Sequence, residues 1–585
     1  QPFVIMNGSV VLVFLLGFGV NALPSPCDSE IYCTGELLRQ VQTAKLFDDD
    51  KHYVDMKLTA APDVVLEAFR NLTSRERNRV LPPATLREFL HKFFDDPGTE
   101  FEPWTPTDWH EKPRFLSKIK DPDLHGWAEE LHLLWKSLGR KISANVSDHP
   151  ELHSMIYIPN PVIVPGGRFR EFYYWDSYWI INGLLLSEMT DTARGMIENF
   201  LYLVDRYGFI PNGGRIYYER RSQPPFLTLM VKSYYDATKD KDFLMKAIPT
   251  LEKEYRFWMQ NRSVAVEMRG QKWVLNHHRS FPYRPESYTD DLELAEELSP
   301  EAKEKLYMEL HSGAESGWDF SSRWFVGNGQ SSSRTTLRDI YTSALVPTDL
   351  NALMCLNERT VAGFHEALGE KSEAMQYHQA YVNRLAAVQE VLWDPEKGAW
   401  FDYNLLTNRS EVAFYPTNLA PVWAGCFNST DMALRSLQYL KQASGALQYP
   451  NGVPTSLKDS GQQWDLPNAW PPLQQLLIQG LSETPSEEAQ ELAFELAQRW
   501  IRTNWLAYIK YEAMFEKYDV NGDGKPGGGG EYEVQLGFGW SNGVALQLLD
   551  EFGDRLTSAA AALSVFPPLA LVSMLLIVLS VPLQP

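Results

Sequence analysis

The feature that most constrains the fold is a helical periodicity that runs through the chain from about residue 30 onward. Apolar side chains recur at intervals of three and four residues, and this spacing lines them up on one face of an α-helix. A clear example has its apolar face at Ile197, Phe200, Leu201 and Val204. Gly208 and Pro211 follow this face, and residues of these two types commonly end helices.

Two further helices are predicted together with their ends. The sequence Thr484-Pro485-Ser486-Glu487 matches a capping box with proline at the first helical position, so a helix should begin after Thr484. Its apolar face is Ala489, Leu492, Ala493, Leu496 and Trp500. The other helix spans 371–392 and stops at Trp393-Asp394-Pro395; its inward positions are Ala374, Tyr381, Leu385, Val388 and Leu392.

Alternating strand patterns are few and short, and no repeat of fixed period is visible in the sequence. We therefore predict one large all-α domain over roughly residues 35–550. The net charge of −21, from 54 basic and 75 acidic residues, disfavours a nucleic-acid partner, since such ligands need a cationic surface. An aromatic content of 13% excludes a mainly disordered chain.

The N-terminal residues have the pattern of a secretory signal peptide. An apolar stretch runs from Val10 to about Val20 and is followed by Asn21 and Ala22. The stretch is too short to span a bilayer, so a membrane anchor is the weaker interpretation. We expect residues 1–22 to be removed after Ala22.

The C-terminal residues favour a glycolipid-anchor signal. No charged side chain follows Arg555, whereas a spanning helix normally carries lysine or arginine on its cytoplasmic side. Small residues at Ser558, Ala559 and Ala560 precede an apolar run that starts near Leu569. We predict attachment at Ser558, a mature chain of 23–558 and a propeptide of 559–585, with a single membrane span as the alternative. This places the protein on the extracellular face of the plasma membrane.

Secretion agrees with the glycosylation sequons, which begin at Asn71, Asn145, Asn261, Asn408 and Asn428. Cysteine is sparse. Cys27 and Cys33 are close enough in sequence to close a small loop, while Cys355 and Cys426 lie among apolar residues and are expected to be buried thiols. No cysteine and histidine cluster has zinc spacing, so no metal site is predicted.

The chemistry is expected in the loops, which are rich in aromatic, polar and glycine residues. Residues 165–179, PGGRFREFYYWDSYW, combine flat rings with hydrogen-bonding groups, a mixture suited to sugars. The alternative is a helix start with buried aromatics. The polar candidates in this loop and the next two are Arg168, Glu171 and Asp176, then Asn212, Arg221, Ser222 and Gln223, then Arg284 and Glu286.

Three more loops contribute carboxylates. Asp319 lies between Trp318 and Phe320, a setting that raises a carboxyl pKa and suits a general acid, although a capping or salt-bridged aspartate is the common alternative. Residues 462–472, QQWDLPNAWPP, supply Trp464, Asp465, Asn468 and Trp470. Glu516 is a candidate base.

Glu531 follows four glycines that suit a flap or a close approach to a ligand, or else a surface linker. The acids from Asp519 to Asp523 resemble the start of a calcium loop, but the twelfth position is Gly530, so calcium is rejected.

Several carboxylates and stacking aromatics on a helical scaffold indicate glycoside hydrolysis, although the residues alone select neither the two carboxylates nor the sugar. Residues 165–178 and 463–472 resemble the two signatures of the trehalases, glycoside hydrolase family 37, and GGGGEY at 527–532 agrees with them. The terminal signals resemble those of the glycolipid-anchored trehalases of mammalian brush borders.

The resemblance implies an (α/α)6 barrel that hydrolyses α,α-trehalose to two glucoses with inversion, without a cofactor. It implies Asp319 as the general acid and Glu516 as the general base. The sugar-binding positions it implies are Arg168, Trp175, Asp176, Asn212, Arg221, Ser222, Gln223, Arg284, Glu286, Gly317 and Glu531. A homodimer stays open.

Physical reasoning adds that an inverting pair should be about 6.5–9.5 Å apart and that Glu516 should stay ionised beside an arginine. The arginines would hold hydroxyls or neighbouring carboxylates. The alternatives are an inverting hydrolase of another α-glucoside and an anchored sugar-binding receptor without catalysis.

Overall fold

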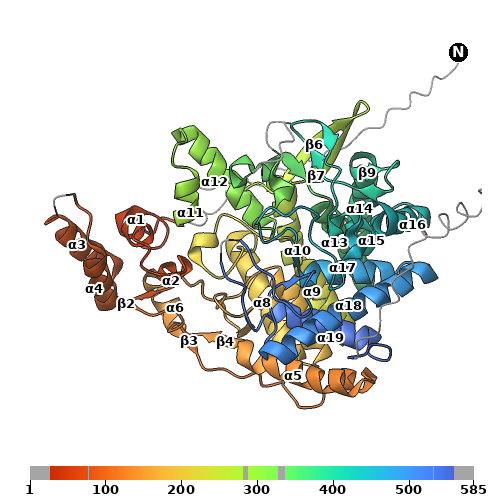
Figure 1. Cartoon of the computed structure of the whole chain (residues 1–585), viewed down its shortest axis with the longest axis horizontal. Helices are drawn as coiled ribbons and strands as arrows, with labels where there is room; N and C mark the ends of the chain where they lie inside the picture. The colour runs from red at the N-terminus through yellow and green to blue at the C-terminus, as the bar shows by residue number, and fades with distance from the viewer. Residues whose placement is uncertain (1–26, 77, 281–287, 327–335, 531, 559–585) are drawn as a thin grey trace, which may run out of the picture.

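The computed structural model describes residues 27–76, 78–280, 288–326, 336–530 and 532–558. Two concentric sets of helices dominate this part of the chain (Figure 1). Each inner helix packs against the next inner helix along the chain, and the last packs against the first, so the inner set forms a closed ring. The inner helices are α7 (Asp176–Leu186), α9 (Leu227–Thr238), α13 (Thr348–Leu368), α15 (Ala420–Ala424), α17 (Pro471–Ser482) and α19 (Gly539–Phe552).

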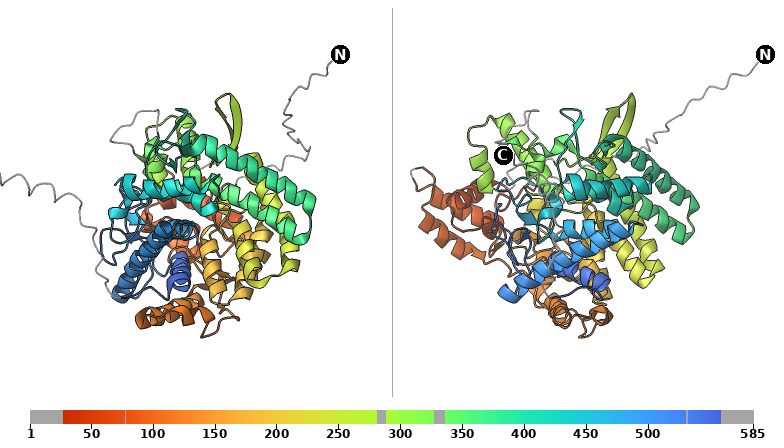
Figure 2. Two further views of the ribbon diagram at one scale, coloured as in Figure 1. Left: turned by 90° about the vertical axis from the view of Figure 1, so that its right-hand side faces the viewer. Right: turned by 45° about the vertical axis from the view of Figure 1, so that its right-hand side comes forward.

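One outer helix precedes the first inner helix, and another lies between each inner helix and the next along the chain. The turned views show the long outer helix 371–392 running beside the inner helix 348–368 in the green part of the chain (Figure 2). The outer helices are α5 (Pro122–Leu138), α8 (Thr190–Tyr207), α10 (Lys241–Asn261), α14 (Lys371–Leu392), α16 (Thr430–Gln438) and α18 (Glu487–Tyr511). The predicted all-α class and (α/α)6 barrel are confirmed. The inner helices are buried on nearly all sides, whereas the outer ones keep a polar face, as their positions require.

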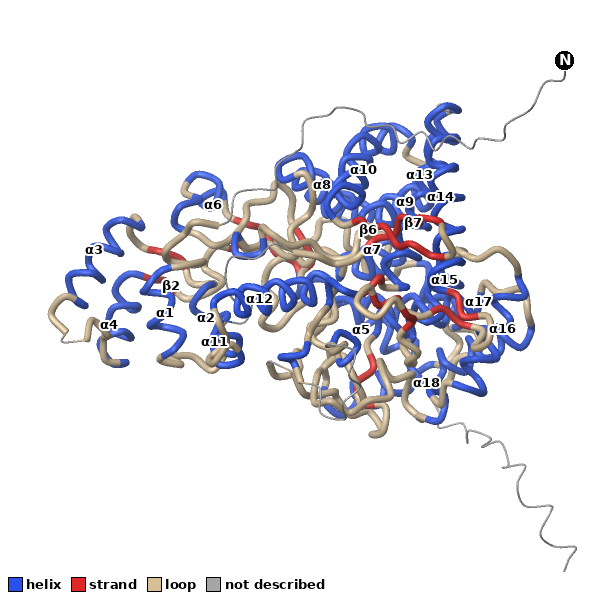
Figure 3. The backbone as a smooth tube through the Cα atoms, turned by 90° about the horizontal axis from the view of Figure 1, so that it is seen from above, coloured by secondary structure: helices blue, strands red, loops and turns tan. Residues whose placement is uncertain are grey.

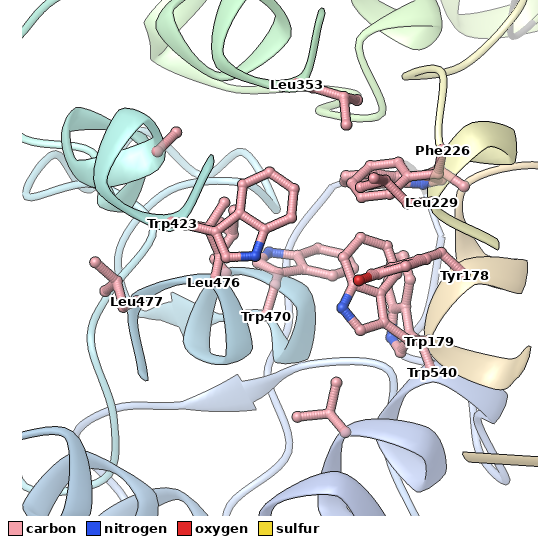
Figure 4. Packing of buried hydrophobic residues seen from close by; sticks show 14 of the residues in the cluster. Tyr178, Trp179, Phe226, Leu229, Leu353, Trp423, Trp470, Leu476, Leu477 and Trp540 are labelled. Carbon is pink, nitrogen blue, oxygen red and sulfur yellow. The ribbon is translucent and has the colours of Figure 1, made fainter. Parts of the chain in front are cut away.

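Large aromatic side chains fill the barrel axis (Figure 4). Trp179 of α7 contacts Phe226, which directly precedes α9, and Trp540, the second residue of α19. Rings of this size bury much apolar area, so this layer is a large part of the core. These rings also line a small apolar cavity, whereas the polar groups converge at one end of the barrel.

The described residues between 27 and 94 form a lobe with a hydrophobic cluster of its own. Its helices are α1 (Gly35–Thr43), α2 (Lys51–Val54), α3 (Pro62–Thr73) and α4 (Pro83–Phe93), and α3 and α4 lie at the far edge of the molecule (Figure 3). The cluster includes Tyr173, Tyr217 and Tyr218 from the barrel loops, which seat the lobe on the barrel. The remaining helices are α6 (Ala144–Asp148), α11 (Tyr288–Leu294) and α12 (Pro300–Glu315).

The described strands are short, as the sequence predicts. They are β1 (Lys57–Leu58), β2 (Phe94–Asp95), β3 (Phe101–Glu102), β4 (Gly139–Ile142), β5 (Val162–Ile163), β6 (Ser263–Met268), β7 (Gln271–Asn276), β8 (Leu345–Val346), β9 (Trp393–Asp394), β10 (Ala399–Trp400), β11 (Tyr403–Asn404), β12 (Arg409–Ser410), β13 (Asn468–Ala469) and β14 (Tyr518–Asp519). The antiparallel pair β13–β14 joins Asn468 to Asp519, so it brings two candidate loops together.

Two predicted helices match the structure at their ends. α8 stops at Tyr207, with Gly208 in the left-handed region at φ 84°, and α14 spans Lys371–Leu392. The start of the third helix was wrong by two residues: α18 begins at Glu487, and the Ser486 hydroxyl accepts from the Ala489 N–H at 3.4 Å. The Thr484 hydroxyl instead donates to the Gly480 carbonyl at the end of α17.

Both pairs of cysteines form disulfides. Cys27–Cys33 closes the predicted small loop. The expectation that Cys355 and Cys426 are free thiols is wrong, because they are bonded with their Cα atoms 6.2 Å apart. Their helices α13 and α15 are neighbours in the inner ring, which brings two distant apolar positions within disulfide range. Among the described residues, no helix has both the length and the apolar character that crossing a bilayer requires.

Replacing both Cys355 and Cys426 with alanine should lower the melting temperature more than replacing both Cys27 and Cys33. The first bond closes a loop of 71 residues and the second a loop of 6. The chain-entropy model then gives about 4 kcal/mol and about 2 kcal/mol of stabilisation, respectively. Calorimetry on the two double variants measures the difference, and a larger loss from the small loop would contradict this account.

Candidate active site

Loops at one end of the barrel surround a cavity of about 1020 Å³, counted to its mouth. Four carboxyl groups line it: Asp50 of the N-terminal lobe, and Asp176, Asp319 and Glu516 from distant segments of the barrel. Other candidates from the sequence that line the cavity are Arg168, Trp175, Asn212, Arg221, Gln223 and Gly317, together with Trp464 and Trp470. The combination of acids, amides and ring faces suits a small polyhydroxylated ligand.

Each carboxyl is placed by a different element. Asp176 is the first residue of α7, Asp319 follows the end of α12, and Glu516 lies just before β14. Gly317, between α12 and Asp319, has φ +79°. A Cβ added at Gly317 would lie 2.6 Å from Cζ2 of Trp175, so only glycine allows the chain to pass this ring.

The carboxyl of Asp319 is in the environment that its sequence neighbours predict. Trp318 and Phe320 are both almost completely buried. Burial raises the pKa of Asp319 to about 7, with the positive charge of Arg221 opposing the rise and the negative charge of Glu516 adding to it. A large fraction of this group is therefore protonated at neutral pH.

The carboxylate of Glu516 has two donors. The Tyr532 hydroxyl donates to Oε1 at 2.8 Å, and Nζ of Lys517 lies 3.3 Å from Oε2. Its backbone is also fixed, because the carbonyl accepts from Nε1 of Trp540 at 3.1 Å. The expected arginine beside this base is replaced by a lysine in the described contacts.

The third acid, Asp176, is 5% exposed. Burial raises its pKa well above the ordinary range, and the charges of Glu516 and Asp319 add to the shift. Burial thus raises the pKa of Asp176 and of Asp319, whereas the carboxylate of Glu516 is held by two donors. This difference in environment is the usual sign of an acid and base pair.

Arg168 connects the N-terminal lobe to this end of the barrel. Its guanidinium donates to both carboxylate oxygens of Asp49, at 2.8 and 2.6 Å, which confirms that an arginine here holds a carboxylate. Its Cζ lies 4.5 Å from the ring centre of Tyr532, the residue that donates to Glu516. The lobe is therefore linked to the base through Arg168 and Tyr532.

The loop at 221–223 is anchored to the end of α12. The Ser222 N–H donates to Glu315 at 3.1 Å, and Arg262 binds both oxygens of that carboxylate at 2.6 and 2.7 Å. The Ser222 hydroxyl donates to the Ile210 carbonyl, so its side chain faces away from the cavity lining. Gln223 accepts from the Trp175 N–H at 3.0 Å and lines the cavity.

Indole rings make one wall of the cavity. Trp464 stacks on Trp470 with centroids 3.8 Å apart and planes 2° apart, and on Trp318 at 5.4 Å. Asp465 points away from this wall: it accepts from Ser321 at 2.9 Å and Ser456 at 2.7 Å, which fixes the loop after Asp319. The sequence singled out Trp464 and Asp465 together, but in the structure Trp464 lines the cavity and Asp465 holds a loop in place.

Some positions were missed and some cannot be compared. Arg284, Glu286 and Glu531 lie outside the described residues. Leu38, Gln42 and Asp50 of the lobe line the cavity without any sequence signal, since they are more than 100 residues from the loops they face. Tyr532 and Lys517 each sit next to a residue that was singled out. In the rejected calcium segment, Asp519 pairs with Lys525 and Asp523 with Arg502.

Comparison with known proteins gives a consistent result. The family model "Trehalase" matches residues 45–553. The chain is 54% identical over 555 residues to trehalase of Homo sapiens, covering 94% of each chain. It is 53% identical over 572 residues to trehalase of Oryctolagus cuniculus, covering 97% of this chain and 98% of the relative.

Among solved structures, neutral trehalase of Saccharomyces cerevisiae superposes with a TM-score of 0.55 at 23% identity, over 70% of this chain and 80% of that one. At this identity the match supports the barrel fold alone.

Proposed function

The chain belongs to the trehalase family and hydrolyses α,α-trehalose to glucose, and from this premise we propose an inverting mechanism with Asp319 as general acid and Glu516 as general base. The observation that carries the assignment is the contrast between the two carboxyls in one cavity. Burial raises the pKa of Asp319 to about 7, while Glu516 is held by a phenol and an ammonium group. The two surroundings suit a proton donor at Asp319 and a proton acceptor at Glu516.

The proposed reaction balances in one displacement. Asp319 gives its proton to the glycosidic oxygen, which leaves with the first glucose. Glu516 takes a proton from a water molecule whose oxygen forms the new bond to the anomeric carbon from the opposite face. The attacked ring becomes β-glucose and the leaving ring keeps its α configuration. Afterwards Asp319 is charged and Glu516 neutral, and solvent restores both.

We assign the remaining candidates to sugar binding. Arg168, Trp175, Asp176, Asn212, Arg221, Gln223 and Gly317 border the space in which the disaccharide would lie, and Arg284, Glu286 and Glu531 are assigned with them from the family motifs. Ser222 supports the loop through its backbone and its bond to Ile210. Aromatic faces and fixed donors of this kind recognise the faces and hydroxyls of pyranose rings.

Proton NMR of the anomeric signals tests the proposed mechanism. The ectodomain without its tail should release α- and β-glucose in equal initial amounts from trehalose, because only one ring is attacked. Asp319→Asn should lower kcat by about 10² to 10⁴-fold while sugar binding stays measurable. Release of α-glucose alone, or an active Asp319→Asn enzyme, would contradict the assigned roles. Turnover of maltose beside trehalose measures how strictly the second sugar is selected.

The pH dependence of kcat/KM should show a falling limb near pH 7. The acid works only when protonated, and burial raises the pKa of Asp319 to about 7. Activity therefore falls as pH rises through this value, approaching tenfold per pH unit. Steady-state kinetics in buffers from pH 4 to 9 at constant ionic strength measures the limb. A rate that stays level up to pH 9 would exclude Asp319 as the titrating acid.

We further propose that residues 1–22 direct secretion and that 559–585 are exchanged for a glycolipid at Ser558, leaving 23–558 on the extracellular face of the plasma membrane. Support comes from the terminal sequences and the sequons. Four of the five sequon asparagines are exposed, namely Asn71, Asn145, Asn408 and Asn428, whereas Asn261 is half-buried and donates to the Phe257 carbonyl. We propose glycosylation at all five, with Asn261 the least accessible.

Treatment of intact cells with a phospholipase specific for phosphatidylinositol should release the enzyme into the medium. The phospholipase cuts a glycolipid anchor, whereas it does not cut a membrane-spanning peptide. Release is measured as trehalose hydrolysis in the supernatant, with Ser558→Leu as the variant that should lose surface display. Activity that stays with the cells would favour a spanning tail. Light scattering of the released protein reports whether it is a homodimer.

A further inference from the structure

Lys517 follows the proposed base directly in sequence, and its side chain is 0% exposed. Nζ lies 2.8 Å from Oε1 of Gln463 and 3.3 Å from Oε2 of Glu516. It also lies 4.9 Å from the ring centre of Trp470 and 5.3 Å from that of Tyr532. A buried ammonium group is costly unless its donors are used, and here a carboxylate, an amide oxygen and two ring faces surround it.

Gln463 connects this lysine to the proposed acid. The side-chain nitrogen of Gln463 donates to the backbone carbonyl of Asp319, and the backbone carbonyl of Gln463 accepts from Nε1 of Trp470 at 2.9 Å. One chain of contacts therefore runs from the carboxylate of Glu516 through Lys517 and Gln463 to the backbone of Asp319. The acid and the base come from loops about 200 residues apart in sequence, and this chain joins them across the cavity wall.

The glycines at 527–530 pack closely against Lys517 and Gln463. A Cβ at Gly527 would lie 2.8 Å from Cγ of Lys517, and one at Gly530 would lie 2.8 Å from Cβ of Gln463. The Gly527 N–H also donates to the Lys517 carbonyl at 3.0 Å. The backbone of this segment thus seals the lysine from solvent, which strengthens the field of the lysine at both carboxyls.

The reaction moves one negative charge from Glu516 to Asp319. Lys517 acts on both carboxyls. It contacts Glu516 directly. Burial is the main cause that raises the pKa of Asp319, and the positive charges of Arg221 and Lys517 oppose that rise. A fixed cation near both groups stabilises the charge before and after proton transfer without moving itself.

We propose that Lys517 and Gln463 are positioning residues that hold the base ionised and keep the acid loop in register with it. Lys517 supplies the fixed positive charge for the catalytic pair, and Gln463 transmits its position to the backbone of Asp319. The proposal rests on the proposed acid and base roles and extends them to two residues that touch neither substrate nor water in the reaction scheme.

Lys517→Met is the direct test, because methionine has similar length and apolar character in a site that is already dry. Removing one partner of a buried ion pair also destabilises a fold, so the melting curve of this variant is measured before its kinetics. We expect kcat for trehalose to fall about 10- to 100-fold with KM changed less than threefold. The acidic limb of the kcat profile should move up by about one pH unit, because Glu516 loses its cation and takes up a proton more easily.

Lys525→Met is the matched control. Lys525 lies on the same hairpin but is 62% exposed, and it pairs with Asp519 outside the cavity. Its replacement should leave kcat and the acidic limb unchanged. Gln463→Met separates geometry from charge: kcat should fall about tenfold while the acidic limb stays in place, since Lys517 keeps its contact with Glu516.

A Lys517→Met enzyme with kcat within threefold of the parent and an unmoved limb would overturn the proposal. If this variant does not fold, judged by its melting curve, Gln463→Met decides, and a normal kcat there overturns it. Glu516→Gln is measured in parallel. Full activity of Glu516→Gln would reject the proposed base itself, whereas an inactive Glu516→Gln beside a normal Lys517→Met would reject only the role of Lys517.

Discussion

The structure depends on giving two carboxyl groups in one buried cavity different surroundings. Removing water from a carboxylate favours its neutral form, and this is the dominant effect on Asp319. Glu516 shares the cavity, and its carboxylate is held by the hydroxyl of Tyr532 and the ammonium of Lys517. The loops place two donors beside Glu516 and bury Asp319 away from water.

The barrel supplies the rigidity that this contrast needs. The inner helices pack around an axis filled with indole and phenyl rings, so the loops start from fixed positions. The loop carrying Asp319 is then tied to a second loop by Asp465, whose carboxylate accepts from Ser321 and from the Ser322 N–H. β13 and β14 join that second loop to the segment of Glu516. A small error in any of these connections would change the distance between acid and base.

Local features could be predicted from sequence where local physics decides them. α14 stops where predicted because Pro395 follows it closely, and the environment of Asp319 follows from its flanking rings. The start of α18 could not be predicted, since Thr484 and Ser486 are both good caps and the choice depends on where α17 ends. The bond between Cys355 and Cys426 and the pairing of Arg168 with Asp49 depend on which helices become neighbours, and periodicity carries no information on that.

The N-terminal lobe shows why such long-range pairing matters. Glu171 is buried with Lys51 and Arg215, and although burial alone would raise the pKa of Glu171, these two cations lower it to about 2. A buried ion network adds little stability over an apolar core, because desolvation offsets most of the attraction. It does penalise any shift of the lobe that leaves a charge unpaired. Since Lys51 is two residues after Asp49, the same network fixes the register in which Asp49 binds Arg168 and Arg168 covers Tyr532. The lobe is therefore held in the one position that completes the surroundings of the base.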